Sequence, residues 1–274
     1  MDANDMDKAL KERLIIIRGA GEMATGVACS LYRANFRRIL MLEIPFPLAI
    51  RRHVTFCEAV HEKCMTVEGI EAVRVFGESE LKQAWTEGKI AVAVDPEGEN
   101  ILRYRPDLLV DAILAKRNLG ISIADAPMVV ALGPGFEAGR DCHVVVETNR
   151  GHDLGRLITA GTAEADTGIP GNIAGYRAER VVRAPTGGIF TTGKEIGDPV
   201  RKGDVIGTVG TAEVIANIDG ILRGLIRPDS SVTMGLKIGD IDPRGEARYC
   251  DTVSEKARTV GGAVLEAMLA VYNV

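Results

Sequence analysis

Short apolar runs alternate with helical patterns along the first half of the chain. The run at 108–114 fits a strand by its length and a helix by its Ala and Leu content. The other segments predict strands at 14–18, 38–43, 90–95, 121–125 and 128–132, and helices at 25–36 and 78–87. This alternation predicts an α/β fold with a Rossmann-like, mostly parallel sheet.

The pattern changes after about residue 180, where short β segments are separated by Gly, Asp and Pro. The segment 196–206 predicts a turn between two strands and resembles the barrel-sandwich hybrid of biotinyl and lipoyl domains. Those carrier domains place a lysine at a hairpin tip, and the matching region 210–217 contains none. We therefore expect a small all-β, barrel-sandwich-like domain that serves as a scaffold rather than as a carrier.

The C-terminal segment predicts a helix that returns to the first domain. Thr252 and Glu255 have the spacing of a capping box, and apolar residues then recur at helical spacing. Two glycines inside this helix, Gly261 and Gly262, are best tolerated where another backbone packs closely. The predicted division is an α/β domain over 1–180, a β-rich domain over 181–250 and the returning helix over 251–274.

Composition narrows the function classes. The 274 residues carry a net charge of −5 with Lys and Arg spread out, which gives nucleic-acid binding little electrostatic support. No apolar run reaches the roughly 20 residues that a membrane span needs, and the polar segment 1–13 lacks a signal-peptide core. The five scattered cysteines predict reduced thiols, so a cytoplasmic protein is expected.

The first glycine turn, at Gly19 and Gly21, fits a dinucleotide-binding fingerprint between a strand and a helix. Backbone N–H groups at the start of such a helix can bind phosphate oxygens. Glu43 ends the next strand, where an acid would bind a ribose hydroxyl. The alternative is a tight turn without a ligand, which the carboxylate of Glu22 favours.

The segment 133–156 has the densest candidate chemistry. Gly133 and Gly135 make a loop that can present N–H groups to an anion. Glu147, Arg150 and His152 follow a short apolar strand and would bind a polar ligand or one another.

The same segment contains a candidate catalytic pair, Cys142 and His143, because a protonated imidazole would lower the pKa of the thiol. The spacing of His143, Glu147 and His152 matches no standard zinc signature, and no metal site is predicted.

Two further segments left alternatives open. Asp111 lies inside an apolar run, and the following Lys116, Arg117 and Asn118 would bind a phosphate or pterin phosphate, or else form a solvated strand end. The start of the last helix, with Ser254, Lys256 and Arg258, would help to hold an anion or form a solvated first turn.

Several long segments between about residues 12 and 271 resemble a known family. They are EIPFPLAIRR, VEGI, LLVDAILAKRN, LGPGFEAGRDCHVVVETNRGHDLGR, TGIPG, ERVVRAPTGGIF, IDGILRGLI and KIGDIDPR. By these segments the chain resembles the YqeB-type family, accessory proteins of selenium-dependent molybdenum hydroxylase systems. The first domain is more distantly similar to the Rossmann domain of XdhC-type maturation factors.

The resemblance implies a maturation role, in which the protein holds molybdenum cofactor or helps to install a selenium or sulfur ligand. A molybdenum hydroxylase subunit is then the expected partner, and a homo-oligomer is left open. The alternatives are an NAD(P)-dependent oxidoreductase and a chaperone with no small-molecule site. All depend on whether the two glycine turns and the His-Glu-Arg cluster meet in one cleft.

Overall fold

The computed structural model describes residues 9–273, and the predictions that fall on residues 1–8 and 274 lie outside the described part. The chain folds into two compact units. Of the described residues, the first unit contains 9–47, 55–166 and 253–273, and the second contains 48–54 and 167–252. Within this part of the chain, no helix has both the length and the apolar character needed to cross a membrane.

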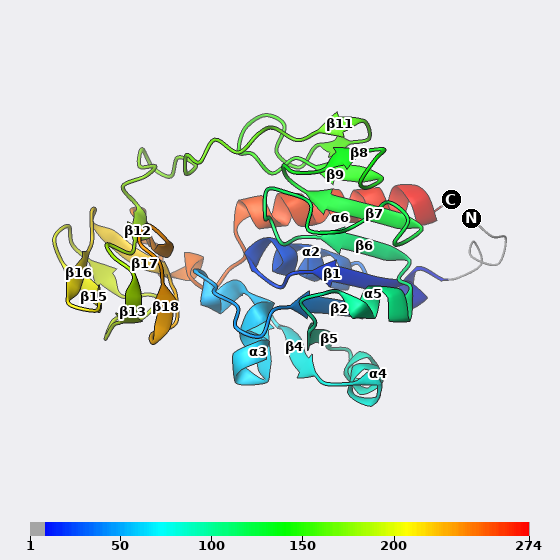
Figure 1. Cartoon of the computed structure of the whole chain (residues 1–274), viewed down its shortest axis with the longest axis horizontal. Coiled ribbons are helices and arrows are strands. Elements are labelled where there is room, and N and C mark those ends of the chain that lie inside the picture. Colours follow the sequence, from blue (N-terminus) through cyan, green and yellow to red (C-terminus); the bar gives the residue numbers. More distant parts are fainter. Residues whose placement is uncertain (1–8, 274) are drawn as a thin grey trace. The chain divides into compact units, whose positions relative to one another are not determined.

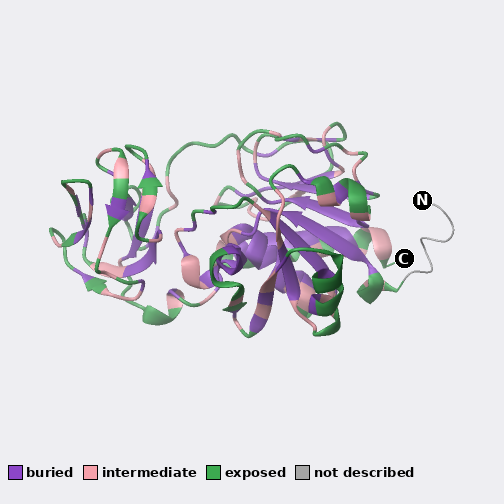
Figure 2. Cartoon of the chain, turned by 60° about the horizontal axis from the view of Figure 1, so that its bottom comes forward, coloured by how far each residue is buried: buried purple, intermediate pink, exposed green. Residues whose placement is uncertain are grey.

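A nine-stranded, mostly parallel sheet forms the centre of the first unit (Figure 1), which confirms the predicted α/β class. Its spatial order is β10-β9-β7-β6-β1-β2-β5-β4-β3, and β3 and β10 pair antiparallel to their neighbours at its two edges. The strands are β1 (Leu14–Arg18), β2 (Arg38–Glu43), β3 (Cys64–Val67), β4 (Ile70–Val75), β5 (Ile90–Val94), β6 (Leu108–Asp111), β7 (Met128–Leu132), β9 (Val144–Val146) and β10 (Leu157–Ile158). The central strands are almost entirely buried (Figure 2).

The strand order reverses beside β1. The chain runs from β1 to β2 and β5 on one side, and β6, β7 and β9 follow on the other. The series β5-β2-β1-β6-β7-β9 corresponds to the order 3-2-1-4-5-6 of doubly wound sheets, which bind ligands at the carboxyl ends where the order reverses. The crevice expected for a ligand therefore lies beyond the ends of β1 and β6.

The helices of the first unit pack on the sheet. The short helices α4 (Glu78–Thr86) and α5 (Glu99–Tyr104) share one apolar core with the strands. The long helices α2 (Glu22–Arg33) and α6 (Glu255–Tyr272) pack along each other. The remaining elements of the unit are η1 (Leu10–Glu12), η3 (Phe56–Glu58), α3 (Ala59–Glu62), β8 (Glu137–Ala138) and β11 (Gly161–Thr162).

Helix α6 also contacts β7 and β9, so the predicted return of the C-terminal helix to the α/β unit is confirmed. The predicted capping box is wrong. Ser254 is the N-cap and accepts a hydrogen bond from the Ala257 N–H (3.3 Å), whereas the Thr252 hydroxyl donates to the Arg248 carbonyl. The helix therefore begins at Glu255, and the Val253 N–H just before it donates to the Glu68 carboxylate (2.9 Å).

The other strands predicted for this unit form, with one exception. The strands at 14–18, 38–43, 90–95 and 128–132 form, and the ambiguous run at 108–114 is a strand that ends at Asp111. The run at 121–125 is a turn rather than a strand, because the Asn118 and Asp125 side chains bind its backbone N–H groups. The β3–β4 hairpin and α5 were not predicted.

The second unit consists of two four-stranded antiparallel sheets around one apolar core, which confirms the predicted separate all-β region. One sheet has the order β12-β19-β17-β14 and the other β16-β15-β13-β18. The strands are β12 (Val181–Arg183), β13 (Gly188–Thr191), β14 (Pro199–Val200), β15 (Val205–Val209), β16 (Ala212–Ile215), β17 (Gly220–Leu225), β18 (Ser230–Val232) and β19 (Lys237–Asp242), with the 3-10 helices η2 (Arg52–Val54) and η4 (Ala247–Tyr249).

The segment 48–54 is part of this second unit. Gly224 lies so close to it that a methyl group at that glycine would be 2.8 Å from the Ile50 carbonyl oxygen. Arg52 Nε donates to the Leu225 carbonyl (2.8 Å), and the Arg51 guanidinium donates to the Tyr249 and Thr252 carbonyls. Two charged side chains thus fasten this short segment through backbone carbonyls.

Candidate functional site

The predicted ligand-binding residues all follow the carboxyl ends of parallel strands in the first unit, or end such a strand. This edge is where an open α/β sheet binds ligands. The residues are Gly19 and Gly21 after β1, Glu43 at the end of β2, Lys116, Arg117 and Asn118 after β6, Gly133 and Gly135 after β7, and Glu147, Arg150 and His152 after β9.

The turn after β1 is tight on one side and open on the other. Gly19 has φ +90°, and a methyl group there would lie 3.2 Å from the Ala112 carbonyl oxygen. A methyl group on Gly21 would meet nothing within 4 Å. Gly19 is therefore required by the fold, whereas Gly21 leaves space at the start of α2 that a ligand can occupy.

Glu43 lies beside this turn. Its carboxylate accepts hydrogen bonds from the N–H groups of Ala20 (2.9 Å) and Ile44 (2.8 Å). Burial raises the pKa of Glu43, and these two hydrogen bonds oppose the shift. The acid thus has the position expected of a ribose-binding group, with its oxygens bound to protein N–H groups.

Asp111, at the end of β6, has the partner that the sequence did not reveal. Its carboxylate pairs with the Arg18 guanidinium at 2.9 Å, and both side chains are buried. Burial raises the pKa of Asp111, while the charge of Arg18 opposes that shift. The pair with Arg18 accounts for an acid inside an apolar run, so the position of Asp111 does not by itself indicate a ligand site.

The loop after β6 has an unusual backbone. Leu114 and Lys116 have φ of +60° and +61°, a conformation that side chains other than glycine rarely adopt. Lys116 pairs with Asp166. The Asn118 amide oxygen accepts the N–H groups of Gly120 (2.8 Å) and Ile121 (2.9 Å), so this side chain shapes the loop.

The loops after β6, β7 and β9 touch one another through glycines. Gly135 has φ +106°, and a methyl group there would lie 2.4 Å from the Arg117 backbone nitrogen. A methyl group at Gly133 would lie 2.5 Å from the Thr148 hydroxyl oxygen. Together with the contact of Gly19 on Ala112, these approaches join the turns into one continuous edge.

The three charged residues after β9 differ in their surroundings. Glu147 is only 3% exposed, and its two oxygens accept the N–H groups of Asn149 (2.6 Å) and Glu164 (2.7 Å). Arg150 Nε lies 3.3 Å from Glu255 Oε1 at the start of α6, whereas His152 is exposed. Glu147 therefore organises the loop, and Arg150 links it to α6.

Lys256 lies in the first turn of α6, where the sequence predicted either an anion-holding helix start or a solvated turn. Burial lowers its pKa, the nearby charge of Arg150 lowers it further, and the charges of Glu22, Glu147 and Asp166 oppose the shift. Within residues 9–273 its amine has no hydrogen-bond or ion-pair partner. The sequence left this helix start undecided because the fold alone brings it to the strand ends.

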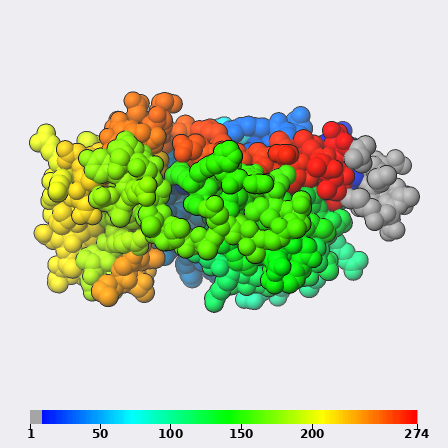
Figure 3. Space-filling model, turned by 90° about the horizontal axis from the view of Figure 1, so that it is seen from above, coloured from blue at the N-terminus to red at the C-terminus, as the bar shows by residue number. Residues whose placement is uncertain are grey.

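The start of α6 borders the loops of this edge. A methyl group at Gly155 would lie 2.7 Å from Thr259 Cγ2, and in Figure 3 the orange-red surface of α6 adjoins the green surface of the loops. Arg150 and Lys256 thus place two cationic groups beside the start of α2.

The candidate catalytic pair does not have the predicted electrostatics. Cys142 is completely buried, and burial raises the pKa of its thiol to about 11. His143 Nδ1 accepts the Val129 N–H (2.9 Å), and burial lowers the imidazole pKa. The predicted lowering of the thiol pKa by a protonated imidazole is therefore wrong. Among residues 9–273, no three His, Cys, Asp or Glu side chains are grouped to hold a metal ion.

The chain is similar to YqeB. It is 48% identical over 257 residues to the uncharacterized protein YqeB of Escherichia coli strain K12, which covers 94% of this chain and 47% of YqeB. The chain thus spans about half the length of this relative. No protein-family model matches the chain. The similarity supports the YqeB-type resemblance and leaves the link to molybdenum hydroxylases a prediction.

Solved structures resemble the chain only weakly. A succinylglutamate desuccinylase/aspartoacylase from Rhodobacter sphaeroides is 27% identical over 31% of this chain and 29% of its own, with a TM-score of 0.23. A protein described as TcdA (CsdL) is 14% identical over 96% of this chain and 88% of its own, with a TM-score of 0.34. Scores this low establish neither a shared fold nor a shared function.

Proposed function

We propose that the first unit binds a phosphate-bearing ligand, molybdenum cofactor or a nucleotide, at the carboxyl ends of β1 and β6. We further propose that the protein assists the maturation of a selenium-dependent molybdenum hydroxylase. The observation that carries the binding proposal is the reversal of strand order between β1 and β6, because doubly wound sheets bind ligands at such a point.

The local chemistry suits a phosphate group. Gly21 leaves open space at the N-terminus of the 12-residue helix α2, where backbone N–H groups favour an anion. Arg150 and Lys256 lie beside this helix start and can neutralise part of the charge of a phosphate. The strained backbone at Leu114 and Lys116 is typical of a binding loop.

The maturation role rests on the YqeB-type resemblance. A factor of this kind would hold the cofactor during modification or before insertion into the hydroxylase. The buried, protonated thiol of Cys142 favours binding and delivery over sulfur transfer by this protein's own cysteine.

For the second unit, we propose a scaffold of the barrel-sandwich type. Strands β15 and β16 form a hairpin, and residues 210–217 around its tip contain no lysine that could be modified. A carrier function has no attachment site there.

One observation favours a second candidate, an NAD(P)-dependent oxidoreductase. Glu43 ends β2 beside the first glycine turn, which is where dinucleotide-binding sheets place the acid that binds a ribose hydroxyl. A dinucleotide would have to compete with the Ala20 N–H for this carboxylate.

Titration calorimetry of the full chain with molybdopterin, CTP, CMP, NADH and NADPH tests the proposal. The Gly21→Val variant should fold normally and lose at least roughly tenfold in affinity, since its new methyl groups enter the ligand space. Gly193→Val is the matched control, because that glycine also has open space around it. Binding of NADH alone supports the oxidoreductase. A hydroxylase complex without any ligand binding supports the chaperone.

A further inference from the structure

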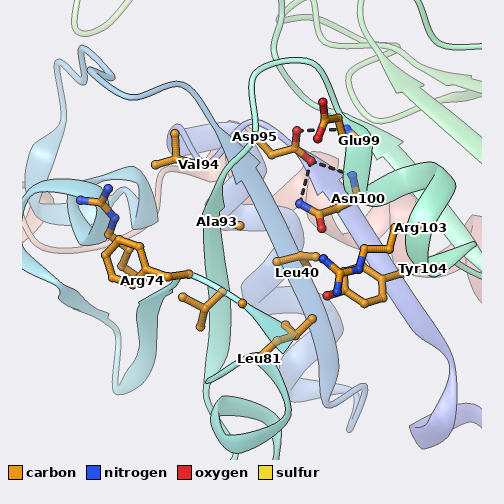
Figure 4. A pocket seen from close by; sticks show the side chains of 13 residues that line it. Leu40, Arg74, Leu81, Ala93, Val94, Asp95, Glu99, Asn100, Arg103 and Tyr104 are labelled. Atoms are coloured by element: carbon orange, nitrogen blue, oxygen red, sulfur yellow. Dashed lines mark hydrogen bonds between the residues drawn. The ribbon is translucent and has the colours of Figure 1, made fainter. Parts of the chain in front are cut away.

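A cleft lies in the first unit, away from the ends of β1 and β6. Its volume is about 260 Å³, and residues at the carboxyl ends of β4 and β5 and on α4 and α5 line it (Figure 4). Strand β2 separates β5 from β1 in the sheet. No part of the proposed phosphate site contributes to this lining.

The floor of the cleft is apolar. Leu40 from β2, Val75 from β4 and Leu81 from α4 line it and are buried. Asn100, Arg103 and Tyr104 form one wall, since their i, i+3, i+4 spacing puts them on one face of α5. Figure 4 shows these three side chains extending from α5 toward Leu40.

The Asp95 carboxylate fixes this wall. It accepts the backbone N–H groups of Glu99 (3.0 Å) and Asn100 (2.8 Å) and also the Asn100 side-chain amide (2.8 Å). The amide nitrogen of Asn100 is therefore held, and its amide oxygen remains available. In the described part of the chain, neither that oxygen nor the Tyr104 hydroxyl has a hydrogen-bond partner. Such groups beside an apolar floor favour a ligand that can pair with them.

The wall also has a flat surface. The Arg103 guanidinium lies over the Tyr104 ring, 5.2 Å from its centroid, and pairs with Glu78 at 3.3 Å. A planar aromatic molecule can stack on guanidinium and aromatic planes. Arg74 also lines the cleft and donates to the Val60 carbonyl (2.7 Å), which leaves its positive charge in place. The charges of Arg74 and Arg103 are balanced by the carboxylates of Asp95 and Glu99, and a lining without net charge favours a neutral ligand.

We propose that this cleft binds a neutral, planar heterocycle of the nucleobase type. The Asn100 amide oxygen accepts a ring N–H, the Tyr104 hydroxyl bonds to the ring edge, and the ring lies on the apolar floor. Pockets for larger ligands have volumes of about 300–1,000 Å³, so a cleft of about 260 Å³ suits one ring system rather than a dinucleotide. This site is distinct from the proposed phosphate site.

Saturation-transfer NMR and calorimetry of the full chain with adenosine, guanosine, cytidine and uridine test the proposal. At least one nucleoside should bind, and Tyr104→Phe should weaken it by roughly threefold to tenfold because one hydrogen bond is lost. Ala93→Leu adds volume inside the cleft and should abolish binding. Leu102→Ala is the control, since this side chain on the same helix is 77% exposed and lies outside the lining.

The proposal is overturned if no nucleoside binds, or if Tyr104→Phe binds as tightly as the wild type. Tyr104→Phe removes a single oxygen atom, so it keeps the test valid should Ala93→Leu fail to fold. Gly21→Val should leave nucleoside binding unchanged. Loss of nucleoside binding in that variant would place the nucleoside at the ends of β1 and β6 and overturn this inference while supporting the first proposal.

Discussion

Gly26 and Gly261 meet backbone to backbone where α2 crosses α6. A methyl group at Gly261 would lie 2.4 Å from the Gly26 carbonyl oxygen, and one at Gly26 would lie 2.5 Å from the Ala257 carbonyl oxygen. A methyl group at the neighbouring Gly262 would meet nothing within 4 Å. Adjacent glycines in one helix therefore have opposite structural roles, and only Gly261 is required by the helix crossing.

This difference predicts stability changes of opposite sign. Gly261→Ala should lower the free energy of unfolding by about 1–3 kcal/mol, because the methyl group forces two packed backbones apart. Gly262→Ala should raise it by up to about 1 kcal/mol, because alanine favours the helix and meets no neighbour. Urea unfolding of both variants measures the two changes. Destabilisation of equal size in both would contradict the close crossing.

The buried pair of Arg18 and Asp111 predicts a pH-dependent loss of stability. Arg18→Met should cost about 3–5 kcal/mol near neutral pH, because it leaves the Asp111 carboxylate buried without its partner. Burial already raises the pKa of Asp111, and loss of Arg18 raises it further. A group with a raised pKa stabilises the fold at low pH and loses that contribution as pH rises through the folded-state pKa.

The cost of Arg18→Met should consequently be smaller at mildly acidic pH than at neutral pH, and adding Asp111→Asn should restore part of the stability. Denaturant unfolding at two pH values compares the single and double variants. A cost that is independent of pH, with no recovery in the double variant, would show that Asp111 does not carry a buried charge.

The sequence predicted the parallel sheet because its signals are local. Runs such as 14–17 and 128–132 are apolar throughout, as is typical of strands covered on both faces. The residues after these strands were also recognised as a group, since glycines and charges follow strand ends in the chain. The contacts of Gly19 on Ala112 and of Gly135 on Arg117 show that these turns adjoin in space.

Features that depend on distant segments were missed. The partner of Asp111 is Arg18, 93 positions earlier, and no periodic pattern connects them. Three hydrogen bonds from arginine side chains to backbone carbonyls join segment 48–54 to the second unit. Nothing in the amino-acid composition of the segment indicates these bonds. The charges of Arg150 and Glu22 act on the pKa of Lys256, and only the fold brings these residues near it.

The cysteines should differ sharply in reactivity. Cys64 is exposed, whereas Cys29, Cys57, Cys142 and Cys250 are buried. Burial raises the thiol pKa of Cys142 to about 11 and that of Cys29 to about 12, so almost no thiolate forms at neutral pH. A thiol-reactive dye should therefore label one site rapidly, and Cys64→Ser should remove that phase. Rapid labelling of Cys142, located by mass spectrometry, would restore its candidacy as a nucleophile.

The two cations beside α2 predict a loss of ligand affinity without a loss of fold. Arg150→Met and Lys256→Met should each weaken binding of the phosphate-bearing ligand by roughly tenfold to a hundredfold, the range for one charged hydrogen bond. Lys256→Met should not lower the melting temperature, because burial and Arg150 already disfavour the charged amine and lower its pKa. Arg156→Met is the matched control, since Arg156 pairs with Asp153 on the same loop.

An anionic ligand near Lys256 should also raise the lowered pKa of that amine. Binding at a pH between the two pKa values then takes up a proton, which calorimetry detects as a binding enthalpy that depends on the buffer's ionisation enthalpy. Lys256→Met should abolish this dependence, and Arg156→Met should keep it. Proton uptake that persists without Lys256, together with unchanged affinity in Arg150→Met, would place the phosphate elsewhere and remove both cations from the site.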